Sequence, residues 1–136
     1  MSRAARSILV FGVYLEVLAV TLIVAPNALL SLFGVAHTHE VWIRVLGVVV
    51  ACIGVYYIVS ARHAFRPVIV ASVPVRLALA MSFAVFVLLD YAAPAVLVFG
   101  IADLVGAVWT AVSLRSDAAT RTCSHTSVSY NHRRNW

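Results

Sequence analysis

The stretch VWIRVLGVVVACIGVYYIVSA, residues 41–61, is apolar along almost its whole length and holds one charged side chain, Arg44. A helix needs about 20 apolar residues to cross the hydrocarbon core of a bilayer, so this stretch predicts a membrane span. Three further stretches have a similar length and character, over residues 7–25, 68–91 and 94–114. The sequence therefore predicts an all-α integral membrane protein built as a four-helix bundle.

The composition agrees with this prediction. Hydrophobic residues make up 63% of the 136 residues and charged residues 11%, and the mean hydropathy of +1.01 excludes an ordinary soluble domain. Residues 1–114 are expected to form a single transmembrane domain. Residues 115–136 are rich in Ser, Thr, Arg, His and Asn and predict a disordered polar tail. A chain of this length has no room for a catalytic domain outside the membrane.

Prolines and arginines mark the ends of the predicted spans. Pro26-Asn27 ends the first span and Arg62-His63 the second, because proline lacks the amide hydrogen and charged residues avoid the bilayer core. Pro74 leaves two alternatives open for the third span. It either kinks the helix or marks its true start, in which case residues 68–73 lie along the membrane interface.

The arginines outside the spans predict the orientation of the chain. They lie before the first span, between the second and third, and after the fourth, and basic residues concentrate on the cytoplasmic side, so both termini are expected in the cytoplasm. A rival interpretation treats residues 1–28 as a cleaved signal peptide, but Glu16 falls in the middle of its apolar region. The arginines in question are Arg3, Arg6, Arg62, Arg66, Arg115, Arg121, Arg133 and Arg134.

Charged residues also lie inside the spans. Glu16 is nine residues beyond Ser7, so at 1.5 Å per residue it lies about 14 Å into the apolar layer, close to the midplane. Arg76 and Asp103 reach a similar depth in the third and fourth spans. Arg44 starts nearer the outer face, but its long side chain can extend several ångströms along the helix.

Three of these charges, Glu16, Arg44 and Asp103, each share a helical face with small residues, which let two backbones approach closely. An unpaired charge near a helix centre costs about 2.5 to 3.5 kcal/mol, so these charges must face one another or water. We therefore expect one polar seam inside the bundle, formed by Glu16, Arg44, Arg76 and Asp103. The small residues expected at helix contacts are Gly12 beside Glu16; Gly47, Ala51 and Gly54 beside Arg44; and Gly100 and Ala107 beside Asp103.

Two interpretations of this seam stay open. Two acids and two arginines make it formally neutral, and paired charges of this kind fix helix register. Alternatively, carboxyl groups near the midplane serve proton and cation relays, with Glu16 the first candidate and Asp103 the second. Arginine stays protonated, so Arg76 and Arg44 would hold a carboxylate ionised or attract an anionic headgroup.

The sequence offers little for enzyme chemistry. No nucleophile lies beside a plausible base within the spans, and no phosphate loop or paired-histidine metal motif is present, so we assign no catalytic residue, cofactor or metal. We interpret residues 37–40 (His-Thr-His-Glu) as a solvated loop, and Cys123, His125 and His132 as part of the unstructured tail. The net charge of +5 follows from membrane orientation and does not require nucleic acid.

Several short motifs resemble a known group of proteins. The segments Trp42–Gly47 and Gly54–Tyr57, with Ala25-Pro26-Asn27 and Phe33-Gly34 before them, resemble the small bacterial four-helix membrane proteins of unassigned function called BphX-like and DoxX-like. The resemblance covers residues 7 to 115. It implies the fold and no activity. The expected location is the bacterial inner membrane.

A second, narrower resemblance concerns the first span. Leu15-Glu16-Val17 is similar to the first helix of the small multidrug resistance family, in which a glutamate binds cations and protons. That resemblance implies that Glu16 is a coupling residue. The chain departs from the family by its greater length, by Arg44, Arg76 and Asp103 in the spans, and by lacking the tryptophan-serine-glycine signature of the third helix.

These observations predict an accessory or structural membrane component with a buried polar seam. The alternative is a small proton-coupled transporter that uses Glu16, and a membrane enzyme acting on a lipid or quinone comes third. The expected partners are the lipid bilayer and either a second copy of the chain or another membrane protein.

Overall fold

The computed structural model describes the backbone of residues 2–133 and the side chains of residues 2–119. This part of the chain is helical and contains no strand. Two of the helical elements are short, and four are long. In chain order they are α1 (Arg3–Val24), α2 (Pro26–Leu32), α3 (Trp42–Arg62), α4 (Arg66–Leu88), the 3-10 helix η1 (Pro94–Val96) and α5 (Leu97–Arg133).

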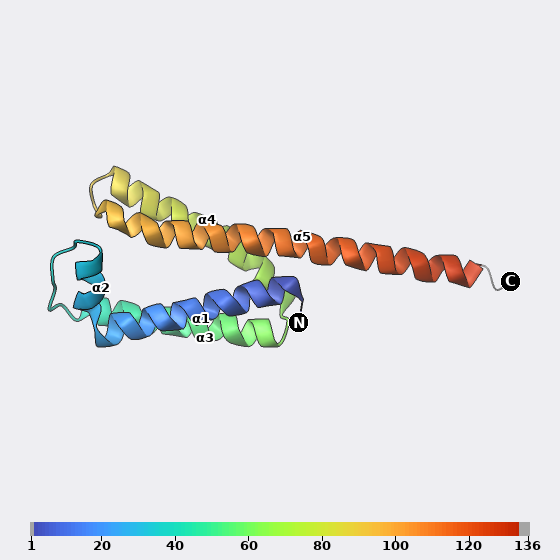
Figure 1. Cartoon of the computed structure of the whole chain (residues 1–136), viewed down its shortest axis with the longest axis horizontal. Coiled ribbons are helices and arrows are strands. Elements are labelled where there is room, and N and C mark those ends of the chain that lie inside the picture. Colours follow the sequence, from blue (N-terminus) through green and yellow to red (C-terminus); the bar gives the residue numbers. More distant parts are fainter. Residues whose placement is uncertain (1, 134–136) are drawn as a thin grey trace.

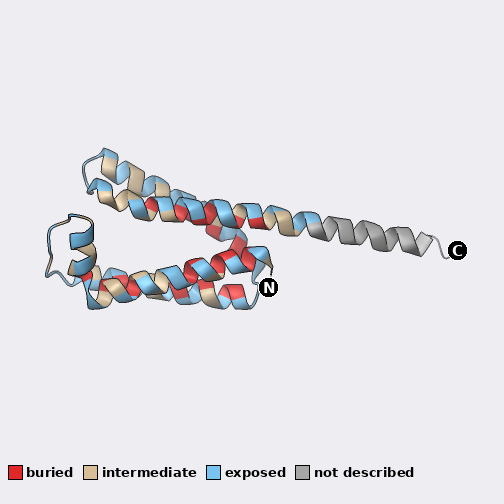
Figure 2. Cartoon of the chain, in the orientation of Figure 1, coloured by how far each residue is buried: buried red, intermediate tan, exposed pale blue. Residues whose placement is uncertain are grey.

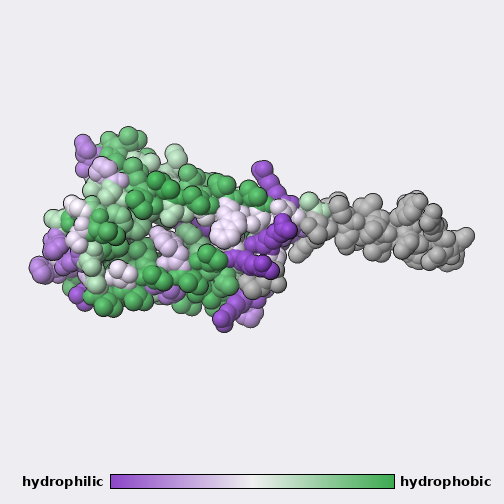
Figure 3. Space-filling model, viewed as in Figure 1, coloured by the Kyte–Doolittle hydropathy of each residue, from purple (hydrophilic) through white to green (hydrophobic). Residues whose placement is uncertain are grey.

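Four helical segments are long and apolar enough to cross a membrane: α1, α3, α4 and the segment Pro94–Ala119. This confirms the predicted all-α bundle of four spans in an integral membrane protein. The observed ends of α1, α3 and α4 differ from the predicted ends by a few residues. Figure 3 shows apolar side chains in a broad band on the visible face, with hydrophilic side chains at both ends of it.

The long helices form two antiparallel pairs, α1 with α3 and α4 with α5 (Figure 1). The two pairs meet mainly through α1 and α5, whereas α4 has only slight contact with α1 and α3. At the end of the bundle that carries α2, the rings of Phe33 and Phe99 add an edge contact with centroids 5.2 Å apart. Helices α1 and α5 thus each contact both their own partner and the other pair.

Buried residues gather toward the end of the bundle where the N-terminus lies, on α1, α5 and the first turns of α4 (Figure 2). The outward faces remain covered with exposed aliphatic side chains, as expected for helices whose surroundings are lipid tails. The main apolar core consists of Ala4, Ala5, Ile8 and Phe11 of α1, Tyr57 and Ala61 of α3, and Ile69 of α4.

Glycines bring α1 and α3 into close contact. A methyl group added at Gly12 would lie 2.9 Å from Ile58 Cγ1 and 3.2 Å from the carbonyl oxygen of Gly54. One added at Gly47 would lie 2.8 Å from Ile23 Cγ1. The two backbones therefore lie closer together at these positions than a side chain would allow.

Near Pro26 the structure has a helix that the sequence did not predict, and at Pro74 it decides between the two alternatives left open for the third span. The short helix α2 was not predicted; Pro26 occupies its first turn, where a missing amide hydrogen costs nothing. Pro74 lies inside α4, which already begins at Arg66. The alternative in which Pro74 marks the start of the third span is therefore wrong, and residues 68–73 belong to the helix.

Helix α5 continues past Leu114, through residues for which the sequence predicted a disordered tail. Its extension brings Asp117 to the first turn of α1, where the carboxylate accepts hydrogen bonds from the backbone amides of Arg3 (3.3 Å) and Ala4 (3.1 Å). These amides have no partner within their own helix. The side chains from residue 120 onward, including Cys123, His125 and His132, lie outside the described part, so their assignment stays a prediction.

Candidate functional site

The centre of the bundle contains a buried arginine. Arg76 of α4 has 2% of its surface exposed, and its guanidinium carbon lies 3.6 Å from the ring centroid of Phe11 in α1 and 5.1 Å from that of Tyr57 in α3. A methyl group at Gly106 of α5 would lie 2.8 Å from Arg76 Nη1. One side chain thus contacts all three of the other spans. We call Arg76, Phe11, Tyr57 and Gly106, with Asp103, the Arg76 cluster.

The local sequence explains why Arg76 points inward. The buried residues of α4 are Ile69, Ser72 and Arg76, which are spaced by three and four and so lie on one face of the helix. Every other position of α4 is at least partly exposed. On α5, the absence of a side chain at Gly106 leaves the space that the guanidinium fills.

Asp103 of α5 is the acid of this cluster. Its side chain is 7% exposed, one turn before Gly106, and it interacts electrostatically with Arg76 and with Tyr14 of α1. No hydrogen bond reaches Nε, Nη1 or Nη2 of Arg76. Two of the four residues predicted for the polar seam, Arg76 and Asp103, thus lie in the same cluster, with the aromatic faces of Phe11 and Tyr57 as the closest partners of the cation.

Glu16 occupies a different place, in the contact between α1 and α3. Its residue is half-buried, and its Oε1 atom is buried without a hydrogen-bond partner. The carboxylate lies against the backbone of Gly54, because a methyl group there would come within 2.5 Å of Oε1. Only the lack of a side chain at Gly54 lets Glu16 lie between the two helices.

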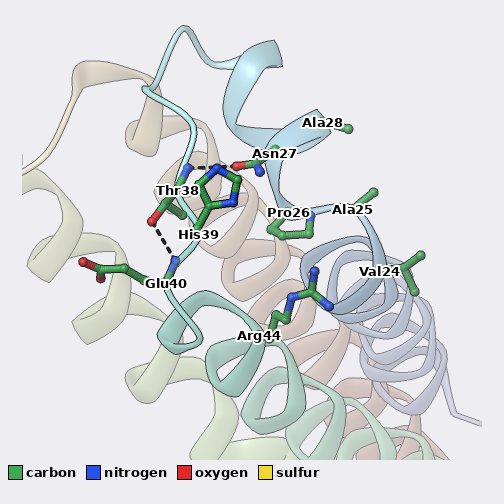
Figure 4. A pocket seen from close by; sticks show the side chains of 9 residues that line it. All are labelled: Val24, Ala25, Pro26, Asn27, Ala28, Thr38, His39, Glu40 and Arg44. Atoms are coloured by element: carbon green, nitrogen blue, oxygen red, sulfur yellow. Dashed lines mark hydrogen bonds between the residues drawn. The ribbon is translucent and has the colours of Figure 1, made fainter.

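Arg44 lies apart from both. It is exposed and lines a cavity of about 300 Å³ at the α2 end of the bundle, next to the end of α1 (Figure 4). The four charges that sequence reasoning expected along one seam thus lie in three places: Arg76 with Asp103 in the centre, Glu16 between α1 and α3, and Arg44 at the α2 end. The small residues named with them are buried, except Ala51, which is partly buried.

Sequence reasoning missed the polar contact between the two helix pairs. Ser7 of α1 and Thr110 of α5 form a buried hydrogen bond with 3.0 Å between their hydroxyl oxygens, and Thr110 also donates to the carbonyl oxygen of Gly106 at 2.8 Å. Ser7 and Phe11 are spaced by four residues, as are Gly106 and Thr110. That spacing on two helices is the signal by which this interface could have been recognised.

A comparison with protein families, curated proteins and solved structures finds no match to this chain. Among the residues that the structure describes, no group of three or more histidine, cysteine, aspartate or glutamate side chains is placed to hold a metal ion. What the site offers chemically is a cation held over aromatic rings, a nearby carboxyl group, and a second carboxyl group in a separate helix contact.

Proposed function

We propose that this integral membrane protein is an accessory or structural component of the membrane, and that its buried charges hold the two helix pairs together. The observation that supports this proposal is the placement of Arg76, whose side chain contacts α1, α3 and α5 from its position on α4. A residue with this role stabilises the bundle and performs no chemistry.

The weak contact between α4 and the first pair makes this side chain important. Apart from the slight contact of α4 with α1 and α3, the second pair reaches the first through α5. A desolvated cation over an aromatic face contributes about 2 kcal/mol. The stack of Arg76 on Phe11 and Tyr57 therefore adds a specific attraction where helix packing is sparse.

The proposal includes the location and orientation of the chain. The distribution of charge supports cytoplasmic termini. Arginines concentrate at the end of the bundle where the N-terminus lies, whereas acids and histidines lie near the α2 end. The resemblance to the BphX-like and DoxX-like groups supports the bacterial inner membrane. The partners we propose are lipids and a second copy of the chain or another membrane protein, because the outward faces are apolar along their length.

The test compares stability with transport in the purified protein. Wild type and Arg76→Leu are unfolded in detergent, and both are reconstituted into liposomes in which a pH-sensitive dye reports proton flux. The structural role predicts that Arg76→Leu unfolds at a lower denaturant concentration and that wild type has no flux above empty liposomes. Wild-type stability in Arg76→Leu would contradict the proposed role of the buried charge.

The alternative function is proton-coupled transport through Glu16. One observation favours it: the Oε1 atom of Glu16 is buried without a hydrogen-bond partner. Carboxyl groups buried within a membrane span commonly serve as proton-binding sites. This function predicts that Glu16→Gln abolishes a wild-type proton flux in a protein that still folds. Glu40→Gln is the matched control, since Glu40 is an exposed carboxylate outside the spans.

A further inference from the structure

The α2 end of the bundle contains a cavity of about 300 Å³, at the lower end of the size range of small-molecule sites. It lies between the end of α1, the start of α2 and the loop that leads into α3 (Figure 4). Its polar lining consists of Asn27, Thr38, His39, Glu40 and Arg44.

Two hydrogen bonds hold the loop in place over this cavity. The backbone amide of Thr38 donates to Asn27 Oδ1 at 2.9 Å, and the amide of Glu40 donates to Thr38 Oγ1 at 3.2 Å. The first bond joins two residues that are 11 positions apart, so it ties the loop to α2. It also occupies the amide oxygen of Asn27, which leaves the amide nitrogen as the group available for a ligand.

Three of the five polar side chains that line the cavity carry nitrogen donors: Asn27, His39 and Arg44. In Figure 4 the guanidinium of Arg44 extends beneath Pro26, and the ring of His39 lies beside the side chain of Asn27. The carboxylate of Glu40 points away from Arg44. Within the described residues, the structure records no hydrogen bond or ion pair for the Arg44 side chain. An arginine with its five donors free, beside an amide and an imidazole, favours an anion.

The cavity lies at the level where a span begins. Arg44 is in the first turn of α3, two positions after Trp42, which is 75% exposed. Tryptophan is enriched at the depth of the lipid headgroups. The start of α3 has no side-chain cap, so its free amides add partial positive charge near the same place.

We propose that this cavity binds a phosphate group through Arg44, with Asn27 and His39 as further donors. Arginine pairs with phosphate through two parallel hydrogen bonds, which lysine or a neutral side chain cannot form. The phosphate belongs either to a lipid headgroup or to a soluble phosphate compound, and the two sources share this recognition chemistry. The cavity lies apart from the Arg76 cluster, so the inference does not depend on the proposed function.

The test measures binding to the purified full-length protein in detergent. The probes are phosphatidylglycerol, followed by native mass spectrometry, and inorganic phosphate, followed by titration calorimetry; phosphate-free diacylglycerol reports unspecific binding. We expect Arg44→Gln to weaken phosphate-dependent binding about tenfold, the effect of losing a charge-assisted pair. The matched control is Arg62→Gln, which removes an exposed arginine at the other end of α3 and should change binding less than about twofold.

The two probes separate the two sources. Binding of phosphatidylglycerol without binding of inorganic phosphate identifies a lipid headgroup, and saturable binding of inorganic phosphate identifies a soluble compound. Equal binding by wild type and Arg44→Gln, an equal loss in Arg62→Gln, or no binding of either probe would overturn the proposal. Helical circular dichroism of each variant checks the fold, and His39→Gln gives a second, weaker loss without altering an arginine.

Discussion

Two buried glycines within the spans, Gly47 and Gly100, should respond oppositely to the same substitution. A methyl group at Gly47 would lie 2.8 Å from Ile23 Cγ1, 3.0 Å from Leu22 Cβ and 3.2 Å from the carbonyl oxygen of Ala19. The nearest atom to a methyl group at Gly100 is Phe83 Cβ at 3.5 Å, an ordinary contact. Both substitutions are Gly→Ala in a helix, so their difference isolates the effect of the neighbouring helix.

The expected magnitudes follow from these distances. Alanine is favoured over glycine in a helix by about 1 kcal/mol, so Gly100→Ala should stabilise the protein by up to that amount. At Gly47 the side chain of Ile23 can rotate away, but Leu22 Cβ and the Ala19 carbonyl are fixed to the backbone of α1. Helix α1 must therefore shift, and overpacking of this kind costs about 1–3 kcal/mol. Gly47→Ala should end about 1–3 kcal/mol less stable than Gly100→Ala.

The free energy of unfolding of both variants and wild type can be measured by denaturant titration in one detergent, with helical circular dichroism as the signal. The same order should appear in thermal melts. If Gly47→Ala is as stable as Gly100→Ala, α1 and α3 do not approach as closely as the structure places them, and the close packing of this pair is refuted.

Three further substitutions test other contacts. Arg76→Leu removes the cation stacked on Phe11 and should destabilise the protein by about 2 kcal/mol, while adding Asp103→Asn, which removes the nearby carboxylate, should recover part of this loss in a double-mutant cycle by the same titration. Asp117→Ala removes the acceptor for two amides of the first turn of α1 and should cost about 1 kcal/mol, seen as faster hydrogen exchange of those amides and a lower unfolding midpoint. Gly34→Ala should cost about 1 kcal/mol through backbone strain alone, because Gly34 has φ +66° and open space around it, and Gly34→Asn should cost less in thermal melts.

The sequence predicts the spans well because each one is a long apolar run that ends at a proline or at charged residues. The depth of the charges in the membrane comes from counting residues along a helix and stays a prediction. Glu16, Arg76 and Asp103 each share a face with small residues or lie on a face that turns inward, which periodicity reveals. These are local properties, and they depend only on neighbours within a few positions of the chain.

The contacts between helices could not be predicted in the same way, because helix order does not determine which faces meet. The stack of Arg76 on Phe11 depends on how α4 crosses α1, and the cap of Asp117 on Ala4 joins residues 113 positions apart. Both depend on tertiary packing, which the periodicity of a single helix does not reveal. The separation of Arg44 from the Arg76 cluster has a simpler cause: Arg44 lies in the first turn of α3, thirteen residues before Tyr57, or about 20 Å along the helix.

The distribution of charge around α1 bears on the choice between the two functions. Phe11 stacks on Arg76 and Glu16 packs against Gly54 of α3, so the two buried sites are separate contacts of α1, five residues or about 7.5 Å apart along the helix. A proton relay from Glu16 to Asp103 would need a polar link between these two sites, and Oε1 of Glu16 makes no hydrogen bond to any described residue. A structural role needs no such connection, because each charge acts on its own helix contact. The separation of the sites thus favours the structural proposal and leaves Glu16 as a proton site only if water links it to solvent independently of Asp103.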